Sequence, residues 1–174
     1  MHGNALTRAY AETRDRWEPV YEVTQIKGDG EAHPLLSPDD EFADYETWDL
    51  GNLNLSEAKT EDMLQYEYGR SALKLGLQLE AQLGVNPFQF GMIGSTDSHT
   101  SLPTAEEENF FGKHSGNEPS PKRATHASIG APDGSLAYMG SDMAASGYAA
   151  VWATEATTRG LSTTWMRFGS SAWA

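Results

Sequence analysis

Apolar side chains recur at steps of three or four between residues 60 and 83, which is the period of one face of an α-helix. The face comprises Leu64, Tyr68, Ala72, Leu75, Leu79 and Leu83, and it is widened by Met63, Leu73 and Leu77. Thr60 is the expected N-cap, and Gly84 is the residue expected to end the helix. The pattern therefore predicts one amphipathic helix over residues 60–83 that packs its apolar face into a core.

Two shorter apolar runs predict strands. Residues 20–26 alternate between two faces, and residues 88–93 form a second run that begins after Pro87. A helix that leads into a strand is half of a βαβ unit, so the chain is expected to have an α/β fold. Between these runs, Phe42, Tyr45 and Trp48 interrupt an acidic stretch and predict a surface segment held down by aromatic packing.

Residues 112–136 are rich in Gly, Pro, Ser, Lys and His, which predicts a long loop. Long loops in compact domains are often lids over a site, but a merely solvated loop has the same composition. Lys113 and His114 bring positive charge to this segment. If it lies beside a site, these side chains would favour a small anionic substrate.

The second strand leads into Gly94-Ser95-Thr96-Asp97-Ser98-His99, where a carboxylate and an imidazole stand two residues apart. In an extended segment, residues i and i+2 point to the same side, so Asp97 and His99 would converge. A carboxylate and an imidazole together suit a divalent metal. The alternative is a polar turn in which Asp97 bonds local backbone and His99 is merely exposed.

Other polar residues are candidates for contact with the substrate or with the side chains that bind the metal. Glu31 and His33 repeat the i, i+2 spacing in a turn-rich loop, where a solvated loop is the alternative interpretation. Glu107 belongs to a capping-box pattern that begins at Thr104, so it either caps a helix or, lying close after His99, contributes to the site.

Several blocks of the chain resemble one known family. They are Trp17-Glu18-Pro19, the run from Tyr21 to Glu31, the run from Val85 to His99, the run from Glu107 to His114, and the run from Ser146 to Ala153. In this order they are similar to the branch of the polymerase-and-histidinol-phosphatase (PHP) superfamily known as domain of unknown function 3604. The resemblance implies a partial (β/α) PHP/TIM-like barrel of mostly parallel strands with flanking helices.

The same resemblance implies that Asp97 and His99 are ligands of a divalent metal (Zn, Mn or Fe) that activates water for hydrolysis of phosphate esters. His2 is a candidate remnant of a further family histidine, whereas the H-x-H pair of the superfamily's opening strand is absent. Residues 158–174 depart from the family pattern. We therefore expect residues 1–174 to be a single domain, the C-terminal portion of such a barrel.

Length and charge narrow the possible functions. A TIM-type barrel typically needs about 250 residues, and this chain has 174. Its formal net charge of −13 argues against nucleic acid or an anionic membrane as a partner. The sequence has no cysteine and no apolar run of about 20 residues, and residues 1–16 lack the apolar core of a signal peptide.

An incomplete barrel leaves sheet edges uncovered, which predicts a homo-oligomer, most simply a dimer. The function that follows is a fragment of a PHP-like, metal-dependent hydrolase that acts on a phosphate or another anionic ester and is weakly active or inactive alone. The alternative is a non-catalytic α/β module without a metal cluster.

Overall fold

The computed structural model describes residues 5–25, 27–101, 106–116, 118–143, 147–150 and 152. In chain order its elements are α1 (Arg8–Trp17), β1 (Val20–Gln25), β2 (Gly28–Asp29), α2 (Glu61–Leu64), α3 (Gly69–Leu83), β3 (Gly91–Gly94), the 3-10 turn η1 (Glu107–Asn109), β4 (Ala127–Gly130), β5 (Ala137–Met139) and the 3-10 turn η2 (Gly140–Asp142). They divide between two compact units. Of the described residues, unit 1 contains 5–21, 69–93, 150 and 152, and unit 2 contains the others.

The helix predicted over residues 60–83 is two helices, α2 and α3, separated by a turn at residues 65–68. In this turn Tyr66 N and Glu67 N donate to the carbonyls three residues earlier, a tighter pattern than the α-helix. Tyr68 is buried, and its ring lies 5.2 Å from that of His33. Tertiary packing of Tyr68 thus interrupts the helical period, and the chain passes from unit 2 into unit 1 at the next residue.

Unit 1 contains α1, α3 and the start of β3. Thr7 caps α1 by accepting a hydrogen bond from Tyr10 N. The Arg14 guanidinium lies 4.7 Å from the centre of the Phe88 ring, which ties α1 to the segment that leads into β3. Gly84, with a φ of +75° and its N–H bonded to Glu80 O, ends α3 as predicted.

The apolar face of α3 is less buried than the sequence pattern predicts. Leu75 and Leu79 are half-buried, and Leu77 is exposed. The most buried positions are instead Gly69 and Gly76. A Cβ atom at residue 76 would lie 2.2 Å from Asn86 Oδ1, so the Asn86 side chain would have to move if another residue replaced this glycine.

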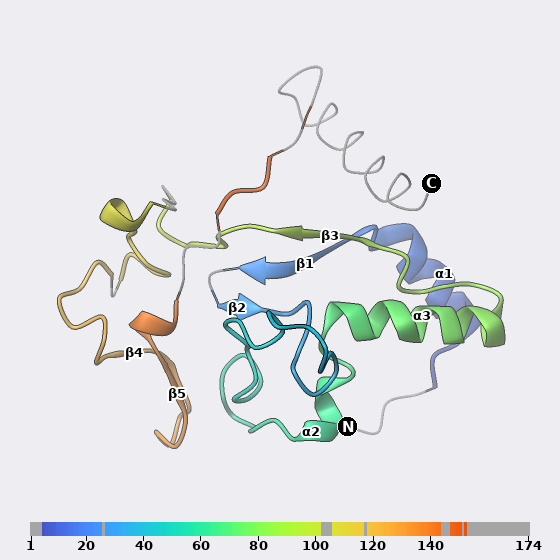
Figure 1. Cartoon of the computed structure of the whole chain (residues 1–174), viewed down its shortest axis with the longest axis horizontal. Helices are drawn as coiled ribbons and strands as arrows, with labels where there is room; N and C mark the ends of the chain where they lie inside the picture. The colour runs from blue at the N-terminus through green and yellow to red at the C-terminus, as the bar shows by residue number, and fades with distance from the viewer. Residues whose placement is uncertain are drawn as a thin grey trace. The chain divides into compact units, whose positions relative to one another are not determined.

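The expected barrel of mostly parallel strands is wrong. The described residues form a three-stranded sheet of order β2–β1–β3 and a separate two-stranded sheet, β4–β5. Both β1–β2 and β4–β5 are antiparallel, and the latter is a hairpin (Figure 1). Short turns join these pairs, whereas a parallel barrel needs a crossover of a dozen or more residues between neighbouring strands. Of the stretch predicted as a long loop, residues 127–130 form β4.

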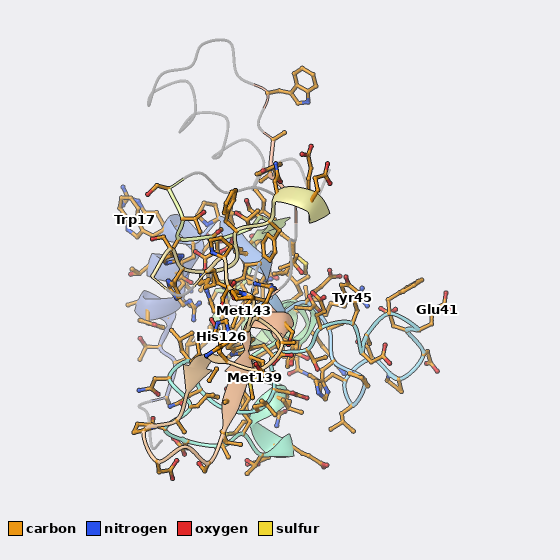
Figure 2. All side chains as sticks on the ribbon, turned by 90° about the vertical axis from the view of Figure 1, so that its left-hand side faces the viewer. Trp17, Glu41, Tyr45, His126, Met139 and Met143 are labelled. Atoms are coloured by element: carbon orange, nitrogen blue, oxygen red, sulfur yellow. The ribbon has the colours of Figure 1, made fainter. Side chains whose placement is uncertain are left out.

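Unit 2 has its own apolar core. Leu55, Tyr138 and Met143 are buried together, and Trp48 stacks on Tyr138 with ring centres 3.5 Å apart. Figure 2 places Met143 near His126, and places Glu41 and Tyr45 on a loop that extends outward. Of the three aromatics predicted to hold that segment down, only Trp48 packs; Phe42 and Tyr45 are exposed.

In the part of the chain that the structure describes, no helix is both long enough and apolar enough to cross a bilayer.

Candidate functional site

A cluster of charged and imidazole side chains lies within unit 2, and we call it the Asp97 cluster. It consists of Lys27, Asp97, His99, Lys113 and His114. Its members come from three segments: the turn between β1 and β2, the loop after β3, and the loop before β4. The structure thus brings four of the residues singled out in the sequence together with one, Lys27, that was not.

The loop after β3 leaves the sheet in an unusual backbone conformation. Ser95 N donates to Thr24 O, which continues the pairing of β3 with β1. Asp97 then has a φ of +47°, in the left-handed region that Asp and Asn tolerate better than most residues. Asp97 and His99 therefore do not lie on an extended strand. The prediction that their i, i+2 spacing points both side chains to the same side assumed an extended backbone, and this assumption is wrong. The left-handed residue nevertheless leaves Asp97 Oδ1 3.9 Å from His99 Nδ1.

Backbone pairing holds the third segment against this loop. His99 N donates to Lys113 O at 2.7 Å, and Ser98 Oγ donates to Gly112 O at 2.7 Å. Gly112 has a φ of +80°, and a Cβ atom there would lie 2.5 Å from Cγ of the buried Glu118. Only glycine fits this position, so Gly112 determines how the next residue, Lys113, approaches Asp97.

Two ammonium groups converge on one carboxylate. Lys113 Nζ lies 2.7 Å from Asp97 Oδ2 and also donates to Asp97 O at 2.6 Å. Lys27 Nζ contacts the same Oδ2 atom. The exposed fraction is 3% for the Lys113 side chain, 14% for Lys27 and 32% for Asp97, so the lysines are more buried than their partner. The three groups together carry one net positive charge in a strongly acidic chain.

The pKa values of the cluster follow from burial and from these contacts. Burial lowers the pKa of Lys113 from 10.5 to about 8, although the Asp97 carboxylate opposes the shift. Burial would raise the pKa of Asp97, but hydrogen bonds from Lys113 and Lys27 outweigh it and lower that pKa below its ordinary value. Burial and then the charge of Asp97 raise the pKa of Glu22.

The two histidines of the cluster lie edge to face, with ring centres 5.1 Å apart. His99 Nδ1 is 2.8 Å from Asp97 O, and because a carbonyl only accepts, this nitrogen carries a proton. The other ring nitrogen of His99, Nε2, can accept a hydrogen bond or bind a ligand. The His99 side chain is 54% exposed. Burial, followed by the proximity of His99 and Lys113, lowers the pKa of His114.

This arrangement does not fit a divalent metal as it stands. One oxygen of Asp97, Oδ2, contacts two ammonium groups, and their positive charge repels a cation at this carboxylate. Among the described residues, no group of three or more His, Cys, Asp or Glu side chains is placed to hold a metal ion. What the cluster can do is present the positive charge of its lysines to an anion.

The remaining candidates lie elsewhere or cannot be placed. His33 is buried, accepts a hydrogen bond from Leu35 N and contacts Asp49 Oδ2 at 3.2 Å, so its position is explained by structural contacts. Glu31 N donates to Asp29 Oδ1 in the same turn. Glu107 begins η1. His2, Thr104 and the tail at 158–174 lie outside the described residues.

Comparison with known proteins gives one match. Residues 1–167 match the family model described as Protein of unknown function (DUF3604). The chain belongs to the DUF3604 family. No curated protein and no solved structure matches it. The family match confirms the resemblance to DUF3604, but it supports neither the assignment to the PHP superfamily nor any activity.

In this DUF3604 chain, sequence reasoning overlooked Lys27 and Glu22. Both belong to the first strand and its turn, whose polar residues were interpreted through Glu31 and His33 alone. A lysine next to Gly28, at the end of a strand that pairs with β3, was the available signal. Lys27 was missed because a lysine in a turn is normally exposed to water, whereas here it contacts Asp97 inside the protein.

Proposed function

We propose that this chain is a PHP-like module whose Asp97 cluster binds a phosphate or another anionic ester, and that it hydrolyses such an ester weakly or not at all by itself. The observation that carries the proposal is the convergence of Lys27 and Lys113 on a single carboxylate. Two cations paired with one anion leave positive charge for a ligand, which the Glu22 carboxylate beside Asp97 partly offsets. Lysine is a common phosphate-binding residue because its ammonium acts as a compact point charge.

The expected role of each side chain in the cluster follows from its exposure to solvent and its contacts. Lys27 is the more accessible of the two ammonium groups, so it would contact the ligand first. His99, with Nδ1 bonded to Asp97 O, would present Nε2 as an acceptor to a water molecule beside the ester. Asp97 competes with any anion for the ammonium groups, so we expect weak binding with a Kd of about 1 mM, or about −4 kcal/mol.

The resemblance of the D-x-H block to the PHP superfamily supports an ester of phosphoric acid as the ligand class. A divalent metal (Zn, Mn or Fe) would be the cofactor of a hydrolase of that superfamily, but the described residues do not fit one. The alternative function is a non-catalytic α/β module. The pairing of Asp97 with two lysines favours the non-catalytic module, because a carboxylate held in this way is available neither to bind a metal nor to act as a nucleophile.

Calorimetric titration of the purified chain with inorganic phosphate tests anion binding. We expect saturable binding that weakens at least fivefold in Lys27→Gln. The matched control is Lys59→Gln, which removes a lysine paired with Glu67 in the same unit and should leave phosphate binding unchanged. Absence of phosphate binding, or equal binding by Lys27→Gln and the native chain, would contradict the proposal.

A panel of p-nitrophenyl phosphate and sulfate esters, together with elemental analysis, separates the two functions. Turnover that is lost in His99→Ala, accompanied by stoichiometric metal, supports the hydrolase. Phosphate binding without turnover supports the non-catalytic module.

A further inference from the structure

We propose that Lys27 and Lys113 take the place of a divalent cation at Asp97, so that this chain excludes the metal for which its D-x-H segment is otherwise suited. The inference is independent of the proposed anion binding, because it concerns the competition between two kinds of cation for one carboxylate. It makes Lys27 and Lys113 specificity-determining residues of the cluster.

The first support is that both ammonium groups occupy one oxygen of the carboxylate, Oδ2. Both lysine Nζ atoms contact Oδ2 of Asp97, and a metal ion bound to that oxygen would lie beside two positive charges. Because the lysines are mostly buried, water screens this repulsion less than it would at an exposed site.

The second support is that Lys113 is held in place by more than its charge. Its Nζ donates to Asp97 O at 2.6 Å, and its own carbonyl accepts from His99 N at 2.7 Å. Its side chain is 3% exposed, so an incoming cation cannot simply displace it into solvent. The ammonium therefore belongs to the folded site and is not a loose surface group.

The third support is that donors of the kinds that bind zinc lie beside Asp97, although no three of the described side chains are placed to hold one ion together. His99 donates its Nδ1 proton to a backbone carbonyl, which is the way a metal-bound histidine is usually oriented, and its Nε2 is left for the ion. His114 lies next to His99, and Glu22 is near enough to Asp97 for that carboxylate to raise its pKa.

The test is a calorimetric titration of the full chain with ZnCl2. We expect the double variant Lys27→Met/Lys113→Met to bind Zn²⁺ at least tenfold more tightly than the native chain. Methionine retains the length and apolar stem of lysine while removing the charge. Adding Asp97→Asn to the double variant should abolish the gain, and the control Lys59→Met should bind Zn²⁺ as the native chain does.

Circular dichroism establishes that each variant is folded. If the double variant does not fold, Lys27→Met alone serves as the test, because Lys27 is the more exposed lysine, and we expect at least a threefold gain from it. The proposal is overturned if the native chain binds Zn²⁺ as tightly as the folded lysine variant, or if removing the lysines gives no gain.

Discussion

Replacing Asp97 with Asn removes the charge that holds the Asp97 cluster together while leaving its shape. Asparagine tolerates the left-handed φ of +47° at least as well as aspartate, and the backbone carbonyl that accepts from Lys113 and His99 is unchanged. Any loss of stability therefore reports on the carboxylate. The buried ammonium of Lys113 would keep only its bond to the carbonyl.

The magnitude follows from the burial of the partners. Removing one partner of a fully buried ion pair costs about 3–5 kcal/mol, whereas an exposed pair contributes about 0–1 kcal/mol. The Lys113 side chain is buried, but Asp97 is about one-third exposed and stays partly hydrated. We therefore expect Asp97→Asn to lower the free energy of unfolding by about 2 kcal/mol.

Urea denaturation followed by tryptophan fluorescence and by circular dichroism measures this loss. The matched control is Glu12→Gln, which breaks an exposed pair with Arg8 in α1 and should cost no more than about 0.5 kcal/mol. In the double variant Asp97→Asn/Lys113→Met the buried charge is gone as well, so much of the lost stability should return. A loss as small as that of the control, or no recovery in the double variant, would refute the reasoning.

Four further predictions concern other features of the chain. Leu64→Ala should cost about 2–5 kcal/mol in urea denaturation because Leu64 is buried, whereas the control Tyr66→Ala, at an exposed residue of the same turn, should change stability little. Gly84→Ala should lower the melting temperature by the equivalent of about 1 kcal/mol because its φ is +75°; an unchanged melting temperature would contradict this. NMR titration of lysine Cε resonances should show Lys113 with a midpoint near pH 8, and the midpoint should be lower still in Asp97→Asn. Because the same lysine titrates near pH 10.5 in the unfolded chain, Lys113 should make the free energy of unfolding rise between about pH 8 and pH 10.5. A Lys113 midpoint near pH 10.5 in the folded protein would contradict this prediction. Light scattering should give the mass of a dimer because the small sheets are open at their edges, and a mass of 19.0 kDa would exclude it.

The local elements were largely predictable from the sequence. The strand expected at residues 20–26 corresponds to β1, the strand expected at 88–93 overlaps β3 only from Gly91 onward, and Gly84 ends α3 as expected. Helix α1 was not predicted, although Thr7 and the i, i+4 pair of Arg8 with Glu12 are its signals. These features depend on a few neighbouring residues, which is why the sequence carries them.

The arrangement of the strands and the partners in the site were not predictable in the same way. Barrel closure depends on which distant strands pair, and the apolar period of one segment does not contain that information. Asp97 was singled out as a metal ligand, but its observed partners lie 70 and 16 residues away in the chain. Whether a carboxylate faces a metal or an ammonium is decided by such distant residues, and a short D-x-H motif does not identify them.

The division of the chain into units affects how it can fold. Neither unit is continuous in sequence, because the chain enters unit 2 after Tyr21, leaves it after Tyr68 and enters it again after Ile93. Residues 22–68 of unit 2 can therefore contact residues 94–149 only after α3 and the start of β3 have been synthesised. Contacts between residues so far apart in the sequence slow folding. A proteolytic cut after Tyr68 or after Ile93 would divide both units between two fragments, whereas a cut after Tyr21 would divide unit 1 alone, so both units are expected to depend on an unbroken chain between Tyr68 and Ile93.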